Sequence, residues 1–147
     1  MSVIPWWPIA ARITFATGFY DSAYAYPNPN PGVAGWCTWY AWQWRHDNLG
    51  DNYTLPSNSA GNATSWDNNL AGQFYIDYNP AYGDVFVQDY SVGYYASYGH
   101  VGIVTGVNGD GTITYCDMNG SSGFGRVGCN TTSNWRGWHF IHQRIGT

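Results

Sequence analysis

The sequence predicts a single α+β domain in which helices come first along the chain and an antiparallel sheet follows. The 147 residues are a typical length for one domain. Every acidic residue is Asp and every basic residue is Arg, so the strong helix formers Glu and Lys are missing, whereas Gly occurs 19 times. After Pro80, the hydrophobic residues change from helical spacing to the alternation of strands.

The clearest helix is predicted from Cys37 to Leu49. The proline-rich segment from Tyr26 to Gly32 cannot continue a helix, so a helix has to begin after it. Residues then recur at helical spacing, and Leu49-Gly50 provides a stop. The recurring positions are Cys37, Tyr40, Ala41 and Trp44. Nearer the N-terminus, residues 9–19 fit a short helix or a strand equally well.

The remaining elements follow in order. A second short helix is expected over residues 57–70, and a strand begins at residues 83–87. Residues 100–107 and 112–119 flank the turn Asn108-Gly109-Asp110-Gly111, which predicts a β-hairpin. Residues 138–145 are expected to form a last strand.

Composition excludes several classes of protein. The formal net charge is −4 and there is no basic run, which argues against a nucleic-acid partner. No apolar stretch is long enough to cross a membrane. Residues 1–11 lack a basic region and contain Pro5 and Pro8, which is not typical of a signal peptide. A protein acting outside the cell would then leave by another route, such as a phage particle or lysis, unless this chain is an excised domain.

Cys37 stands where the predicted helix begins. Unpaired backbone N–H groups and the positive end of the helix dipole stabilise a thiolate there relative to the thiol. A cysteine hydrolase would place its nucleophile at such a position. The competing interpretation is a buried structural cysteine, and position alone favours neither.

The hairpin brings a histidine toward two polar residues. Pairing Val107 with Thr112 across the turn places His100 opposite Asn119, and Asp117 two positions away on the same face. The diagonal from Asp117 to His100 is roughly 7–8 Å between Cα atoms, which an imidazole can span. Gly102, opposite Asp117, has no side chain to block this path. An acceptor in that place would hold one tautomer of His100.

Four segments together resemble one known family, the CHAP (cysteine- and histidine-dependent amidohydrolase/peptidase) domain. They are Gly-Trp-Cys-Thr-Trp-Tyr-Ala at 35–41, Gly-Asn-Ala at 61–63 with Trp66, Tyr-Gly-His-Val-Gly-Ile-Val at 98–104 and Asp-Met-Asn-Gly at 117–120. The resemblance covers about residues 25–145, with the motifs in the family's order. It implies a papain-like α+β fold and cleavage of amide bonds in bacterial peptidoglycan, as an amidase or an endopeptidase.

The resemblance also implies roles for individual residues. The nucleophile falls on Cys37, the general base on His100, and the orienting pair on Asp117 and Asn119. The family usually has Glu where this chain has Asp117, and often Gln where it has Trp36. Some relatives carry several Asp in a calcium loop before the cysteine, whereas only Asp21 lies nearby here. We therefore expect no metal and no cofactor.

We expect a groove with walls formed by residues 26–36 and 90–99, since both segments run directly into the proposed catalytic residues. The expected substrate contacts are aromatic: Tyr26, Trp36, Tyr94, Tyr95 and Tyr98. We assign residues 1–24 to an N-terminal extension and residues 25–147 to the catalytic domain, and expect a monomer that acts on the cell wall, extracellular or phage-associated. The main alternative is a non-catalytic, aromatic-rich module that binds cell wall or carbohydrate. The related NlpC/P60 peptidases are a further alternative, but Asp117 and Asn119 argue against them.

The other cysteines and histidines leave alternatives open. Cys116 should face away from Asp117, toward the core. A Cys116–Cys129 disulfide is an alternative outside the cell. The remaining histidines show no metal-ligand spacing and are interpreted as solvated or core residues: His46, His139 and His142.

Overall fold

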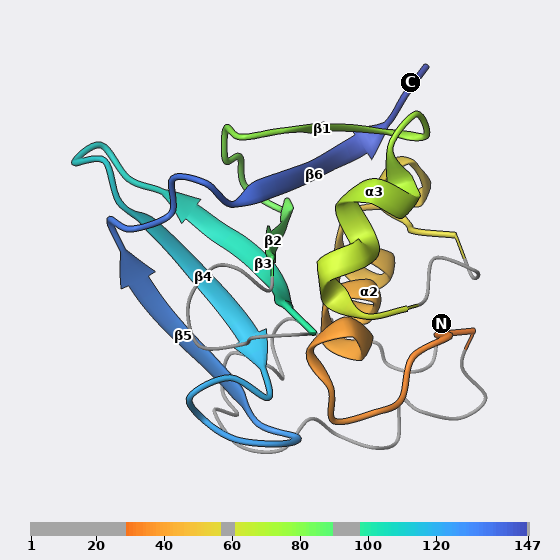
Figure 1. Cartoon of the computed structure of the whole chain (residues 1–147), viewed down its shortest axis with the longest axis horizontal. Coiled ribbons are helices and arrows are strands. Elements are labelled where there is room, and N and C mark those ends of the chain that lie inside the picture. The colour runs from red at the N-terminus through yellow and green to blue at the C-terminus, as the bar shows by residue number, and fades with distance from the viewer. Residues whose placement is uncertain (1–28, 57–60, 90–97, 147) are drawn as a thin grey trace.

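The computed structural model describes residues 29–56, 61–89 and 98–146. Within them, six strands form one antiparallel sheet in the order β1-β6-β2-β3-β4-β5. Figure 1 shows helices α2 and α3 next to this sheet. The strands are β1 Phe74–Asp77, β2 Val85–Gln88, β3 His100–Val107, β4 Ile113–Met118, β5 Val127–Thr132 and β6 His139–Arg144. The predicted extension, residues 1–24, lies outside the described residues.

Helix α2, Cys37–Asn48, confirms the predicted helix to within one residue. The second predicted helix is shorter than expected. It consists of a 3₁₀ turn, η3 Ala63–Ser65, followed by α3, Trp66–Leu70, while residues 57–60 are not described. Another 3₁₀ turn, η2, covers Asp51–Tyr53. The Asn-rich composition explains the short helix, because Asn side chains compete for backbone hydrogen bonds.

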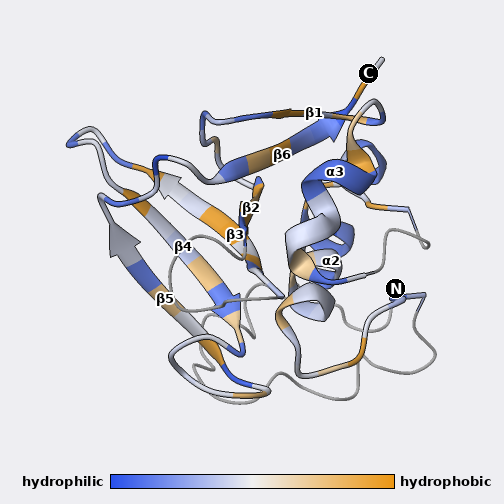
Figure 2. Ribbon diagram, viewed as in Figure 1, coloured by the Kyte–Doolittle hydropathy of each residue, from blue (hydrophilic) through white to orange (hydrophobic). Residues whose placement is uncertain are grey.

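The sheet separates two groups of buried side chains. Residues of α2, including Tyr40 and Trp44, join alternate strand residues such as Val87 and Val101 in the larger cluster. Phe86, between the core residues of β2, belongs to the second cluster with Trp138 and other residues. Figure 2 shows the hydrophobic residues spread along β3, β4 and β6. Burial on both sides explains why β2 is buried throughout.

The predicted hairpin forms, but its turn pairs differently. Val107 lies opposite Ile113, not Thr112, and an irregularity between Val104 and Gly106 shifts the register by one residue. Beyond it, Ile103 pairs with Cys116, so continuing the register places Gly102 opposite Asp117, as expected from the sequence. The bulge therefore compensates for the wrong turn pairing before the strands reach the site.

Strands β1 and β5 were not predicted. Each forms an edge of the sheet, with β1 beside β6 and β5 beside β4. Edge strands are half exposed and need no long hydrophobic run, which is why their sequences carry a weak strand signal.

Arg45 connects helix α2 to the inner strand β6. Its guanidinium is fully buried and donates to backbone carbonyl oxygens of Gly83, Ile141 and His142. Burial lowers the pKa of Arg45 to about 10, although the negative charge of Asp84 opposes this shift. These bonds link the C-terminal half of α2 to β6 and to the residue before Asp84.

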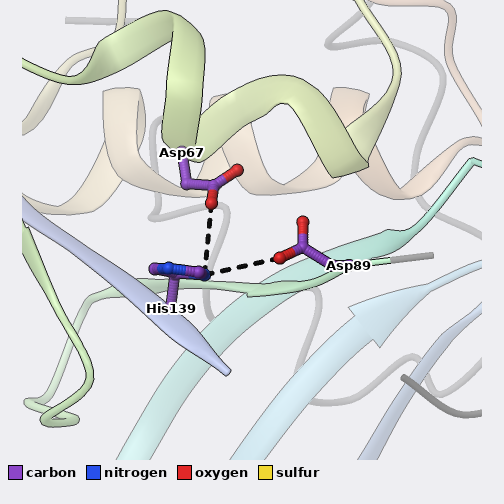
Figure 3. Close-up of side chains that lie close together, drawn as sticks. All are labelled: Asp67, Asp89 and His139. Carbon is purple, nitrogen blue, oxygen red and sulfur yellow. Dashed lines mark ion pairs between the residues drawn. The ribbon is translucent and has the colours of Figure 1, made fainter. Parts of the chain in front are cut away.

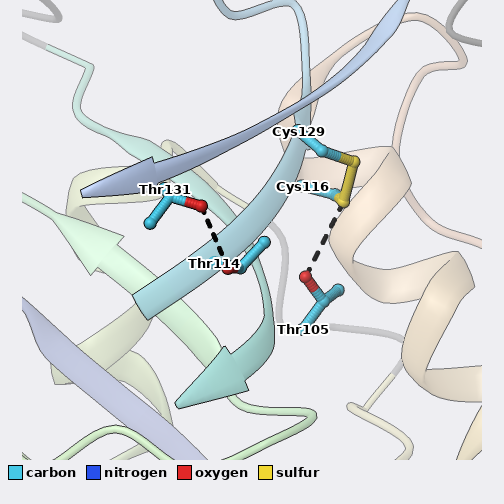
Figure 4. Close-up of a disulfide and its surroundings, with 5 residues drawn as sticks. All are labelled: Thr105, Thr114, Cys116, Cys129 and Thr131. Carbon is cyan, nitrogen blue, oxygen red and sulfur yellow. Dashed lines mark hydrogen bonds between the residues drawn. A yellow bond between two sulfur atoms is a disulfide. The ribbon is translucent and has the colours of Figure 1, made fainter. Parts of the chain in front are cut away.

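Cys116 and Cys129 form a disulfide that joins β4 to β5 (Figure 4). The sequence left a free Cys116 and a Cys116–Cys129 disulfide as alternatives, and the structure contains the disulfide. Thr114 and Thr131, two positions along the same strands, are 3.1 Å apart through their hydroxyl oxygens. The bridge lies next to Asp117 in the chain and fastens the edge strand β5 to the strand that carries this residue.

We expect loss of this disulfide to lower stability while leaving catalysis intact. A bridge closing a loop of about 15 residues contributes about 3 kcal/mol in the chain-entropy model. The double variant Cys116→Ala/Cys129→Ala should lose about that much free energy of unfolding in urea titrations. Reductant should destabilise the wild type but leave the double variant unchanged. Equal stability of the two oxidised proteins would contradict this prediction.

Candidate active site

Cys37 is the first residue of helix α2. Trp36 occupies the N-cap position with extended backbone angles, and no side chain caps the helix end. The first backbone N–H groups of the helix are therefore directed toward the surroundings of Cys37. The thiol is free of any disulfide and its residue is 9% exposed, so it is buried but reachable from one side. The proline-rich segment before it explains why the helix begins here.

His100 is the first residue of β3 and is almost completely buried. Its Nε2 lies 2.8 Å from Oδ2 of Asp117 on the neighbouring strand β4. The imidazole also shares a side-chain hydrogen bond with Cys37. The structure thus places the ring between the thiol and the carboxylate.

The charge state of His100 follows from these neighbours. Burial alone would lower its pKa, but the hydrogen bonds to Asp117 and Cys37 outweigh it and raise the pKa of His100 to about 9. The imidazole therefore holds a proton readily at neutral pH. A protonated ring between a thiol and a carboxylate can stabilise a thiolate.

Asp117 is 5% exposed. Its carboxylate fits where it does because the nearby residue Gly120 has no side chain. A side chain at Gly120 would place its Cβ 2.6 Å from Oδ2 of Asp117, closer than real contacts allow. The sequence predicted that Gly102, opposite Asp117, leaves a path open for the His100 side chain. The structure gives another reason for glycine at this position, because a Cβ there would lie 2.5 Å from the Phe86 ring. Both glycines make room for the strand that carries the carboxylate.

Asn119 follows β4 and lines the groove described below. Its φ of 60° is in the left-handed region, which Asn tolerates better than most residues. His100 lines the same groove. The hydrogen bond from the His100 ring nitrogen Nε2, however, goes to Asp117.

A groove of about 560 Å³ opens above these residues. Its lining includes residues 30–33 with Trp36 on one side, and Tyr98 and Gly99 on the other. Trp36 is 48% and Tyr98 66% exposed. Of the two predicted walls, the described residues thus contribute only residues 30–33 and 36 of the first and residues 98–99 of the second to the lining. Three predicted aromatic contacts fall outside the described residues: Tyr26, Tyr94 and Tyr95.

Sequence reasoning missed other groove residues. The lining of the groove also includes Trp42 of α2, Trp66 of α3 and residues 61–63. Phe124 packs edge-on against Trp36, with ring centroids 5.3 Å apart, and is 55% exposed. The hydrogen bond from the Gly125 N–H to the Gly35 carbonyl holds this loop against the start of the helix. Only the folded chain brings residues 120–125 to this wall.

Residues 26–119 match the CHAP domain family, and the chain therefore belongs to this family. It is similar to the N-acetylmuramoyl-L-alanine amidase sle1 of Staphylococcus epidermidis, with 34% identity over 85% of this chain and 36% of the relative. It is also similar to the probable autolysin LDP of Staphylococcus aureus, with 33% identity over 95% of this chain and 44% of the relative. The chain thus spans less than half the length of these curated relatives.

The fold is shared with a solved structure. A crystal structure of an N-acetylmuramoyl-L-alanine amidase from Staphylococcus aureus superposes with a TM-score of 0.69 at 24% identity. The match covers 77% of this chain and 32% of that chain. In the described residues, no helix is long and apolar enough to cross a membrane.

Proposed function

We propose that this chain is a peptidoglycan hydrolase that cleaves amide bonds with Cys37 as nucleophile and His100 as general base. The observation that carries the proposal is the buried imidazole of His100, placed between the Cys37 thiol and the Asp117 carboxylate at an open groove. Membership of the CHAP domain family supports it, as do relatives that are named as amidases and autolysins.

The first half of the reaction forms a thioester. Because Nε2 of His100 faces Asp117, Nδ1 is the nitrogen left to accept the Cys37 proton. The thiolate attacks the carbonyl carbon of the substrate, and the backbone N–H of Cys37 donates to the resulting oxyanion. His100 then gives its proton to the leaving nitrogen as the C–N bond breaks, which releases an amine and leaves an acyl group on sulfur.

The second half restores the enzyme. His100 takes a proton from water, the hydroxide adds to the thioester carbonyl, and the C–S bond breaks. The products are a carboxylic acid and the Cys37 sulfur, which recovers its proton from the imidazolium. Acid–base assistance of this kind contributes about 10²–10⁴-fold to the rate. No cofactor is required for either half.

The arrangement is papain-like in our proposal, with the nucleophile at the start of a helix and the base on the adjacent sheet. Residues 25–147 form the catalytic domain and residues 1–24 an extension. The substrate places the site of action outside the bacterial membrane, in the cell wall, as for an endolysin or a secreted autolysin. We propose a monomer with no nucleic-acid partner.

Analysis of digested cell walls tests the proposal. Purified protein should release soluble fragments from peptidoglycan, and mass spectrometry should identify the new ends. Free stem peptides with a new N-terminal alanine indicate an amidase, whereas new amines within the peptide or bridge indicate an endopeptidase. The Cys37→Ala variant should produce neither. Unchanged walls after incubation with folded wild-type protein would overturn the hydrolase assignment.

The exposed aromatic residues of the groove are proposed to bind substrate. Trp36→Ala and Tyr98→Ala should each raise KM about 10-fold with a smaller change in kcat, because stacking and apolar contact are lost without altering the reacting groups. Tyr75→Ala is the matched control, since Tyr75 is 46% exposed but lies on β1, outside the groove lining. Equal effects in all three variants would contradict a specific role for the groove.

A further inference from the structure

A second cluster of polar side chains lies outside the proposed catalytic residues. Figure 3 shows Asp67 of α3, Asp89 after β2 and His139 at the start of β6 directed toward one another. Oδ2 of Asp67 is 3.1 Å and Oδ2 of Asp89 is 3.6 Å from the same ring nitrogen, Nδ1 of His139. One atom from each residue lies within 4.8 Å of the other two.

His142, two residues along β6, shows how a histidine normally satisfies two carboxylates. Its Nδ1 lies 2.8 Å from Oδ1 of Asp84, and its Nε2 lies 2.7 Å from Oδ1 of Asp77. Each carboxylate has its own ring nitrogen, so a protonated ring can donate to both. At His139, by contrast, both carboxylates converge on Nδ1, and one N–H can serve only one of them well.

The cluster also leaves buried polar atoms unsatisfied. Asp67 is 8% exposed, and its Oδ1 makes no hydrogen bond among the described residues. Nδ1 of His139 likewise lacks hydrogen-bond geometry, despite its short distance to Asp67. A buried carboxylate oxygen without a partner is costly, and a bound cation would offset that cost.

The charges point the same way. In the described residues, the ion pairs of Asp67 and Asp89 involve His139 and no arginine. In this part of the chain one imidazole is thus the only basic side chain paired with the two carboxylates, and a cation would balance their charge.

We propose that Asp67, Asp89 and His139 bind a divalent transition-metal ion of the zinc class, each through one ligand atom. Ligands about 2.0–2.1 Å from a tetrahedral Zn²⁺ ion lie about 3.3–3.4 Å apart. The separations of 3.1 and 3.6 Å between Nδ1 of His139 and the two carboxylate oxygens lie on either side of this value. A nitrogen ligand with only two carboxylates suits zinc better than calcium, which takes six to eight oxygen ligands. Water would complete the fourth position.

The surroundings of the cluster are built to hold these ligands. The hydroxyl of Thr64 lies 3.1 Å from Oδ1 of Asp89 and leaves Oδ2 directed at the cluster. The ring of Tyr78 packs over His139 with centroids 4.5 Å apart. Such contacts fix the orientation of metal ligands in known sites.

The proposed ion would join three elements at the back of the groove: α3, the end of β2 and β6. Trp66, the neighbour of Asp67, lines the groove, and the N–H of Thr64 donates to the carbonyl of Tyr98 at 2.8 Å. The ion would therefore stabilise one groove wall without touching the reacting groups. Its role is structural, distinct from the proposed reaction at Cys37.

Metal titration of chelator-treated protein tests this proposal. The experiment uses the Cys37→Ala background, so that the thiol cannot bind the probe. Isothermal titration with Zn²⁺ should show one equivalent bound, and saturation should raise Tm by about 5 °C or more. Co²⁺ should give the visible absorption of a four-coordinate site without a sulfur charge-transfer band.

Three variants locate the ion. Asp67→Asn, Asp89→Asn and His139→Gln should each weaken Zn²⁺ binding at least 10-fold, whereas Asp77→Asn, at the His142 cluster, should bind as tightly as the parent. Circular dichroism checks folding, and Asp89 is the most exposed ligand, so its variant is the one expected to fold without difficulty. The proposal is overturned if the Cys37→Ala parent does not bind Zn²⁺, or if the folded Asp89→Asn variant binds it as tightly as the parent.

Discussion

Replacing Cys37 with alanine is expected to abolish turnover while leaving the fold intact. Loss of a nucleophile typically costs on the order of 10⁴-fold or more in kcat, because the acyl intermediate can no longer form. The side chain is small and lies at the start of α2, so its truncation should change stability little. Release of soluble wall fragments, measured with purified folded protein, provides the rate.

The same variant separates an enzyme from a binding module. Cys37→Ala should still bind purified cell walls in sedimentation assays, because the aromatic walls of the groove remain. Cys116→Ala/Cys129→Ala is the matched control, since it removes the other two cysteines and should keep its turnover. Wall clearing by Cys37→Ala at the wild-type rate would contradict the proposed mechanism and favour the non-catalytic alternative.

Asp117→Asn is expected to cause the second largest loss of turnover. An amide keeps the size of the side chain but removes the charge that stabilises the imidazolium, a change that costs about 10⁴-fold in the Ser-His-Asp proteases. Asn119→Ala should cost less, because Nε2 of His100 donates its hydrogen bond to the Asp117 carboxylate. The reverse ranking would make Asn119 the orienting residue while leaving the cysteine mechanism standing.

The pH dependence of kcat/KM distinguishes this role from a structural one. The pKa of His100 is raised to about 9, so the ring keeps its proton below that pH and loses it as pH rises through it. Activity of the wild type should therefore fall above about pH 9. Without the Asp117 carboxylate, the imidazolium is less stable and the alkaline limb should move to lower pH. Asn119→Ala should leave the limb in place, and an unmoved limb in Asp117→Asn would contradict the assignment.

Local patterns account for what could be predicted from the sequence. The start of α2 at Cys37 follows from prolines before it and helical spacing after it, both properties of neighbouring residues. The β3–β4 hairpin likewise follows from alternation around a turn. These two elements suffice to suggest that Cys37, His100 and Asp117 belong to one site, and the family resemblance rests on the same segments.

Errors in the prediction arose where a neighbouring strand or helix decides the outcome. The pairing of Val107 depends on a bulge that no local signal marks, and the expected consequence at Asp117 holds only because the bulge shifts the register back. The edge strand β5 could not be predicted from its own residues, because it is defined by its pairing with β4. The same pairing brings Cys129 to Cys116.

The sequence by itself determined the helix that begins at Cys37, the hairpin that carries His100 and Asp117, and the family, because each depends on residues close together in the chain. Only the tertiary structure decided the hydrogen bond from His100 to Asp117, the groove and the grouping of Asp67, Asp89 and His139. These features join segments far apart in sequence, and burial of a common core, not local preference, brings such segments together.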